Sequence, residues 1–561
     1  MLLLPIALAA FTHMWNPIGQ FSPWFGYDEG AYMGHTMHVL AGLGPHRYYD
    51  HPYFGQLFLA SVLRMIGYPN SLHPSANDIH SIEMLLFVPR VVMGILAVFD
   101  TFLIYKISER RYNTLVGLIA SVLFAVTPLS WFTRLVLLDS IQLPFILSSI
   151  LFASYVKASE NTSKSYNNFL SSLSGIFLGL SIFTKEPAFI LILLVGFLIF
   201  KNSNRNLKIL ALWFVPVILL PSIWPAYSIY MNNFNEWLQF IHSRTNMQGS
   251  SSLYYAIKYD FNNLDSLLLI SGMIGLVYSV FKRDLFLLMW VIPFIIFLYS
   301  VGFVQIFHPL PLVPAFCIAV AVLITDISNK LSTTSNSLII GKKINLILPF
   351  TLTFVLVIYG LVNTTILITS DPTKLYFKSI ALVGEYLVDN SNGTRIALIS
   401  NPFFGWMFSY VFYPQNDYRI YDSSYDAAIP IHTEKVILIA DQNFMSGVYS
   451  GANPFTHYYV QYATNATDKV IDRIQRIYSG ANPFTHYYYV QYATNATDKV
   501  IDRIQTPPTI QIPKDWRSSV STYIYDSSIN MAYRVISYKI PQELEYDGVL
   551  LKPKTLTPFV L

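Results

Sequence analysis

The chain has few charged residues and a single cysteine. Only 12% of its 561 residues are Asp, Glu, Lys or Arg, and 53% are hydrophobic, whereas a soluble globular protein carries roughly 25% charged residues. Cys317 has no second cysteine to pair with, so an intrachain disulfide and a cysteine-based zinc site are both excluded. The shortage of charge predicts a membrane protein.

The small excess of positive charge does not point to nucleic acid. The formal net charge is +4, but the Lys and Arg residues lie in short hydrophilic gaps between apolar runs, whereas a nucleic-acid interface would gather them on one face. We therefore expect membrane lipids and no nucleic acid as partners. The segment 1–15 is apolar without a basic start, which favours a first membrane helix over a cleaved signal peptide.

Apolar runs long enough to cross the roughly 30 Å hydrocarbon layer recur through the first two thirds of the chain. Lipid cannot satisfy an open backbone, so each run is expected to be a helix. The sequence predicts about eleven spans, near residues 1–18, 84–105, 113–132, 135–156, 169–184, 186–200, 208–229, 266–281, 285–304, 308–326 and 344–369.

The basic loops all fall on one side of this arrangement. By the positive-inside rule that side is cytoplasmic, so the N-terminus is predicted inside. The long first loop (19–83), the loop near 230–265 and everything after about residue 370 are predicted outside, in a protein of the cell membrane. The loops that carry the signal contain Lys106, Arg110 and Arg111; Lys157 and Lys164; Lys201, Arg205 and Lys208; Lys282 and Arg283; and Lys330, Lys342 and Lys343.

The composition changes near residue 370. Residues 1–370 are predicted to form a membrane domain that includes the outer loop 19–83, and residues 371–561 a soluble outer domain of α/β or α+β type, with short β-rich runs at 395–400 and 435–440. Segment 449–475 recurs almost identically at 478–505 with one additional Tyr. Two copies are too few for a solenoid, so we interpret them as a recent duplication or an error in sequence assembly.

An acidic pair follows the first span on the predicted outer side, in Gly26-Tyr27-Asp28-Glu29-Gly30. A positioned carboxylate can remove a proton from an acceptor hydroxyl that attacks the anomeric carbon of a sugar. The alternative is a helix start, where acidic residues meet the positive end of the helix dipole. The residues alone leave both interpretations open.

Further ionisable residues are predicted at the same membrane face. Asp50 and His51 could contact the acceptor, hold a metal or only shape the loop. Arg134 begins the fourth span, where it could serve a site or extend to the interface, whereas Asp139, more than one turn deeper, favours a function because such a residue is costly in lipid.

The turn between the fifth and sixth predicted spans contains Lys185, Glu186 and Pro187. Lys185 could neutralise a lipid phosphate, or it could pair with Glu186 as a cap of the hairpin. His308 opens the proline-rich tenth span, where it could contact phosphate or only lie at the interface. These scattered elements converge on one face, and this convergence favours a site there.

The order of these motifs resembles the protein O-mannosyltransferase superfamily of GT-C glycosyltransferases, which includes the aminoarabinose transferases. The resemblance rests on the early DE pair, the His51-Pro52 element, the start of the fourth span from Arg134 to Asp139, the Lys185-x-Pro187 turn and the prolines after His308. It covers roughly residues 1–370 and implies a GT-C fold.

The resemblance also implies an activity. Such enzymes pass a sugar from a polyprenyl or dolichyl monophosphate to a hydroxyl of a protein, lipid or glycan. By this resemblance Asp28 is the base, Glu29 assists it, and Asp139 orients the acceptor or the donor sugar. Lys185 and Arg134 are expected to bind the carrier phosphate. Apart from the resemblance, we expect His308 to contact the phosphate as well, and Tyr27, Asp50 and His51 to contact the acceptor or the sugar.

The resemblance leaves the cofactor and the acceptor open. No cofactor is implied with certainty, and a divalent metal, if there is one, would be held by Asp28, Asp139 and His51. The chain has no MIR-like segment of the eukaryotic protein mannosyltransferases, which leaves the acceptor open. It also lacks the WWDYG motif of oligosaccharyltransferases, so transfer of a whole oligosaccharide is disfavoured. Two other classes compete with the enzyme: a transporter or flippase of lipid-linked sugars, and a non-catalytic receptor that acts through its outer domain.

Overall fold

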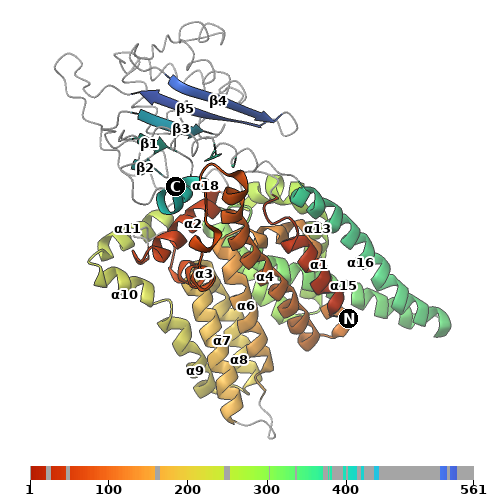
Figure 1. Cartoon of the computed structure of the whole chain (residues 1–561). Coiled ribbons are helices and arrows are strands. Elements are labelled where there is room, and N and C mark those ends of the chain that lie inside the picture. The colour runs from red at the N-terminus through yellow and green to blue at the C-terminus, as the bar shows by residue number, and fades with distance from the viewer. Residues whose placement is uncertain are drawn as a thin grey trace, which may run out of the picture. The chain divides into compact units, whose positions relative to one another are not determined.

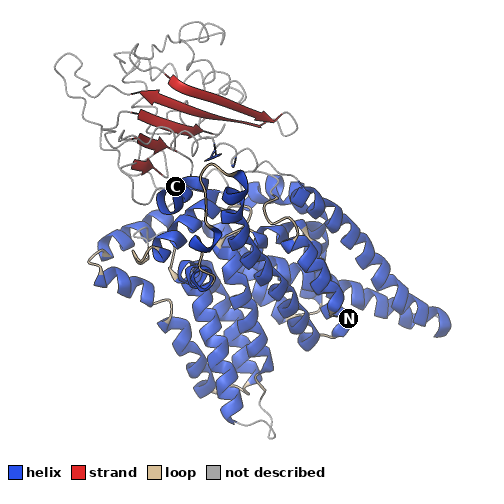
Figure 2. Cartoon of the chain, in the orientation of Figure 1, coloured by secondary structure: helices blue, strands red, loops and turns tan. Residues whose placement is uncertain are grey.

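The computed structural model contains two compact units, one of which is almost wholly helical (Figure 2). It describes residues 2–19, 27–45, 51–157, 164–245, 253–301, 304–334, 338–369, 377, 380–381, 396–399, 402–412, 419–421, 435–440, 518–526 and 531–539. The first unit comprises Met1–Phe21, Leu43–Val62 and Phe87–Ser370, and the second comprises Ser22–Gly42, Leu63–Leu86 and Asp371–Leu561. Asp50 and the repeat at 449–505 lie outside the described residues.

Six helical spans among the described residues are long and apolar enough to cross a membrane, which identifies an integral membrane protein. A seventh span results if α5 (Thr114–Val126) and η3 (Pro128–Arg134), which meet at a bend of 70°, are counted as one. The six are formed by α4 (Ile79–Arg111), α6 (Leu138–Tyr155), α9 with α10 (Leu207–Leu219 and Ile223–Tyr230), α13 (Asn262–Phe281), α15 (Val313–Thr334) and α16 (Leu338–Thr369).

The remaining predicted spans fall on shorter or less apolar helices. α6, α7 and α8 are neighbours in the bundle, with α9 against α7 (Figure 1). Every predicted apolar run therefore coincides with helix, although the count of eleven crossings stays a prediction. The shorter elements are α1 (Leu3–Met14), α3 (Phe54–Met65), α7 (Lys164–Thr184), η4 (Glu186–Leu191), α8 (Ile192–Asn202), α11 (Phe234–Thr245), α14 (Leu285–Val301) and η6 (Leu310–Leu312).

The bend between α5 and η3 is held by side chains from other helices. Pro128 is two residues beyond the end of α5, and it has no N–H to continue the backbone hydrogen bonds of the helix. The Thr12 hydroxyl of α1 donates to the Ala125 carbonyl at 2.5 Å, and the Thr364 hydroxyl of α16 donates to the Val126 carbonyl at 2.8 Å. Carbonyls freed at the bend thus find partners within the protein, as an apolar surrounding requires.

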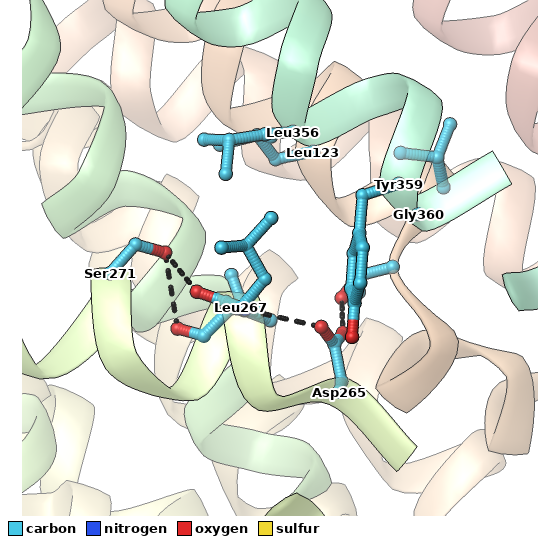
Figure 3. A pocket seen from close by; sticks show the side chains of 10 residues that line it. Leu123, Asp265, Leu267, Ser271, Leu356, Tyr359 and Gly360 are labelled. Atoms are coloured by element: carbon cyan, nitrogen blue, oxygen red, sulfur yellow. Dashed lines mark hydrogen bonds between the residues drawn. The ribbon is translucent and has the colours of Figure 1, made fainter. Parts of the chain in front are cut away.

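Asp265 supports the other side of the same bend (Figure 3). It departs from helical geometry at the start of α13 (φ −151°, ψ 64°) and is only 1% exposed. Its carboxylate accepts hydrogen bonds from the Thr127 hydroxyl and, at 3.1 Å, from the Leu268 N–H, so it caps α13 while holding the α5–η3 junction. The adjoining cavity, about 20 Å³, is comparable to one water molecule, so it is not a sugar site.

The second unit contains a five-stranded sheet with the order β2-β1-β3-β5-β4. β1 is parallel to β2 and β3, whereas β5 is antiparallel to β3 and β4. β1 and β3 coincide with the two predicted β-rich runs, and the type of the whole outer domain stays a prediction. The strands are β1 (Ile396–Ile399), β2 (Arg419–Tyr421), β3 (Lys435–Ala440), β4 (Ser518–Asp526) and β5 (Met531–Lys539).

Parts of the first loop belong to the second unit. The sequence assigned the whole of 19–83 to the membrane domain, whereas 22–42 and 63–86 group with residues 371–561. α2 (Tyr27–Leu40) packs there against α18 (Pro402–Met407), which continues into η7 (Phe408–Phe412). The predicted limit at 370 coincides with the end of the first unit, and the domain assignment as a whole stays a prediction.

The cap made by Asp265 predicts a graded loss of stability. Asp265→Ala leaves buried donors without an acceptor, at about 1–3 kcal/mol for each, whereas Asp265→Asn keeps an acceptor oxygen and costs less. The measurement is the free energy of unfolding in mixed micelles. Ser271→Ala is the matched control, because the Ser271 hydroxyl lines the same cavity and donates within its own helix, to the carbonyls of Leu267 (2.7 Å) and Leu268 (3.4 Å). Equal losses for Asp265→Ala and Ser271→Ala would contradict the capping role.

Candidate active site

The acidic pair lies in the first turn of α2. Tyr27 is the first residue of this helix, and Asp28 and Glu29 follow it. The Glu29 side chain is fully buried, and Asp28 is half-buried. Two carboxylates at this position meet the positive end of the helix dipole. The helix start inferred from the sequence is therefore present, and it is compatible with a base at Asp28.

Lys185 and Asp139 form a buried ion pair. The Lys185 Nζ and Asp139 Oδ2 atoms are 2.7 Å apart, and each side chain is 3% exposed. Asp139 is the second residue of α6, and Lys185 lies in the turn between α7 and η4. The Gln142 amide, one turn further along α6, donates to the carbonyls of Ser181 (3.1 Å) and Lys185, so the turn is tied to α6 by side chain and backbone.

Lys185 and Glu186 bond to different partners and not to each other. A cap between Lys185 and Glu186 was one interpretation, but the Lys185 ammonium bonds to Asp139 and the Glu186 carboxylate to His51. The His51 Nδ1 and Glu186 Oε2 atoms are 3.2 Å apart. Because Lys185 is in extended conformation, adjacent side chains point apart and reach different partners.

Phe307 connects this pair to the start of η6. The Lys185 Nζ lies 5.1 Å from the centre of the Phe307 ring, a cation–π distance. The ring of His308 contacts Phe307 edge-on at 5.1 Å. His308 Nδ1 accepts a hydrogen bond from the Gln305 N–H at 3.1 Å, which leaves Nε2 to carry the ring proton in the neutral form.

Arg134 is fully buried, so its extension to the membrane interface is excluded. Its guanidinium donates to the carbonyls of Thr12 (3.2 Å), Trp15 (3.0 Å) and Asn16. These carbonyls lie at the end of α1, and the last carbonyls of a helix have no backbone N–H partner within that helix. The phosphate contact expected for Arg134 stays a prediction, whereas its structural role at α1 is evident.

The predicted residues are thus divided between the two units. Lys185, Asp139, His51 and Glu186 lie together in the first unit with Phe307 and His308 nearby, and Asp28 with Glu29 lies in the second. The side chain of Tyr27 and the whole of Asp50 fall outside the described residues.

The donor set for a metal does not assemble in the described part of the chain. No three His, Cys, Asp or Glu side chains among those residues are grouped closely enough to hold an ion. Of the three residues offered by the sequence, Asp139 and His51 are in the first unit and Asp28 is in the second.

Two residues were missed by reasoning from the sequence. Asp265 was missed because it lies at the end of the predicted outer loop 230–265, with no motif around it, although an acidic residue beside an apolar run was itself a signal. Glu186 was considered only as a partner of Lys185. Its pairing with His51 joins positions that are far apart in the chain, and no local pattern predicts such a contact.

A family model described as dolichyl-phosphate-mannose-protein mannosyltransferase matches residues 80–229. The match is a minority of the chain, but it includes Arg134, Asp139 and Lys185. It confirms the resemblance to the protein O-mannosyltransferase superfamily inferred from the motifs. No curated protein sequence matches the chain.

Solved structures share the fold at low sequence identity. The Archaeoglobus fulgidus oligosaccharyltransferase in complex with Zn and sulfate has a TM-score of 0.50 and 13% identity, over 80% of this chain and 69% of that one. ArnT from Cupriavidus metallidurans bound to undecaprenyl phosphate also has a TM-score of 0.50 and 13% identity, over 79% and 93% of the two chains. Both likenesses indicate a GT-C-type fold.

The buried ion pair predicts strong coupling between its members. Lys185→Met or Asp139→Leu alone leaves a buried charge without its partner and is expected to cost about 3–5 kcal/mol of unfolding free energy, whereas the double replacement is expected to be close to neutral. The measurement is a double-mutant cycle on unfolding in mixed micelles. If the two single losses simply add in the double variant, the pair is not coupled in this way.

Proposed function

From the confirmed resemblance to the protein O-mannosyltransferase superfamily, we propose that this chain is a membrane glycosyltransferase. It transfers mannose or another hexose from a polyprenyl- or dolichyl-phosphate carrier to a hydroxyl of a protein, lipid or glycan at the outer membrane face. The observation that carries the proposal is the buried Lys185–Asp139 pair at the turn between α7 and η4.

Lys185 is suited to the carrier phosphate. A buried ammonium needs a negative partner, and Asp139 supplies one in the free protein. The phosphate of the carrier offers a second negative partner, and its charge rises when the sugar leaves. A lysine that interacts with this charge more strongly as it develops would stabilise the transition state. The undecaprenyl phosphate bound to ArnT, a protein of the same fold, supports a carrier of this chemistry.

Asp28 is proposed as the base. Its carboxylate accepts the proton of the acceptor hydroxyl while the hydroxyl oxygen forms a bond to the anomeric carbon. The bond from that carbon to the carrier phosphate oxygen breaks, and the electron pair leaves with the phosphate. One displacement of this kind inverts the anomeric centre. Burial of Glu29 beside Asp28 in the first turn of α2 holds the pair in place.

The first test replaces the proposed base. Full-length protein in nanodiscs receives radiolabelled polyprenyl-phosphate hexoses and native membrane extract as acceptor. Asp28→Asn is expected to bind the carrier like the wild type and to lose transfer by about 100-fold or more, the usual scale of general base catalysis. Asp78→Asn is the control, because Asp78 is an exposed carboxylate of the first loop that caps α4, and asparagine caps equally well.

The outcomes separate the enzyme from its competitors. Transfer by the wild type and its loss in a folded Asp28→Asn variant support the proposal. Equal transfer in both removes Asp28 from the role of base. No transfer from any hexose donor contradicts the glycosyltransferase, and carrier movement across the bilayer without transfer would identify a flippase instead.

The second test removes the proposed phosphate ligand without leaving a buried charge. The double variant Lys185→Met with Asp139→Leu is expected to fold, yet to bind radiolabelled undecaprenyl phosphate at least about tenfold more weakly, since a hydrogen bond to a charged group contributes about 1.5–3 kcal/mol. Lys201→Gln, near the end of α8, is the control lysine. A stable double variant with wild-type carrier affinity would show that the pair serves structure only.

A further inference from the structure

The helix that begins with the acidic pair is held by a segment from the far end of the chain. α2 and α18 belong to the same unit and pack against each other. Gly34 is at the contact: a Cβ atom built on it would lie 3.6 Å from the Cβ of Trp406. Trp406 is 1% exposed, and Met407 and Phe408 beside it are fully buried.

A second contact lies one turn further along α2. The ring of His38 meets the ring of Tyr410 edge-on, with 6.3 Å between their centres. Gly34 and His38 are four residues apart and therefore share one face of the helix. Met33 and Met37, with the same spacing, are both buried. The segment 406–410 thus contacts α2 at two positions one turn apart, and two such contacts restrain the direction of the helix.

The direction of α2 determines where Asp28 lies. Asp28 precedes Gly34 by six residues, which corresponds to roughly 9 Å along the helix axis. A small tilt at the Trp406 contact is therefore carried to the carboxylate at the helix start. A base must lie within hydrogen-bond reach of the proton that it removes, and a misplacement of about 1 Å can lower a rate by about 100-fold.

We propose that Trp406 is a positioning residue for the Asp28–Glu29 pair, so that the outer domain contributes to the transfer reaction through α2. The inference rests on the proposed role of Asp28 as base. Trp406 acts by packing against the helix and is not itself catalytic. Since donor binding is assigned to Lys185 in the other unit, loss of the Trp406 contact should impair turnover without weakening the carrier interaction.

The experiment separates turnover from donor binding in the full-length protein. Trp406→Ala is expected to lower kcat by about 10- to 100-fold, with KM for the polyprenyl-phosphate hexose and the affinity for undecaprenyl phosphate unchanged. Trp406→Phe keeps a buried ring and is expected to recover most of the rate. Tyr299→Ala is the control for loss of a large aromatic side chain, because Tyr299 is 78% exposed on α14.

A reciprocal variant tests the same contact if Trp406→Ala does not fold. Gly34→Leu adds a side chain against Trp406 and is expected to lower kcat. Combining it with Trp406→Ala makes room for the new side chain, so the double variant should be faster than Gly34→Leu alone. Such a recovery supports a direct contact that positions α2, whereas further loss in the double variant contradicts it.

The outcomes also separate this inference from the proposed function. If the wild type is active and Asp28→Asn is not, an unchanged kcat in Trp406→Ala overturns the positioning role alone. A fall in carrier affinity that parallels kcat also overturns it, because that result indicates general loss of structure. If the wild type transfers no label, the glycosyltransferase proposal fails, and the role of Trp406 fails with it.

Discussion

The arrangement of the first unit depends on one constraint: backbone groups freed where an apolar helix bends must find partners inside the protein. Lipid offers none. At the bend between α5 and η3, the hydroxyls of Thr12 and Thr364 donate to the last two carbonyls of α5. The carboxylate of Asp265 accepts from the hydroxyl of Thr127, the residue between α5 and η3. These three side chains come from α1, α16 and α13, so three other helices are bonded to the bend.

The position of the candidate site follows from this bend. η3 leads directly into α6, whose second residue is Asp139. Arg134, at the end of η3 and four residues before α6 begins at Leu138, bonds to carbonyls at the end of α1. Asp139 then meets Lys185 in a pair with 3% exposure on each side. A pair so deeply buried contributes little net stability, which is compatible with the role proposed for Lys185 at the carrier phosphate.

The acidic pair has a different support. α2 is grouped with the sheet-containing unit and packs there against α18. The proposed base and the proposed phosphate ligand are therefore built on separate units.

The sequence by itself determined the membrane class, the apolar runs that fold as helices and the turn at Lys185, because these depend on local composition and periodicity. It left the helix start at Asp28 and Glu29 as one of two interpretations. Only the tertiary structure decided the partners. Lys185 bonds to Asp139 and not to Glu186, Arg134 bonds to the end of α1, and Asp265 joins two helix breaks. Partner choice depends on which distant segments pack together, and hydrophobic periodicity places a residue on a helix without saying which helix will face it.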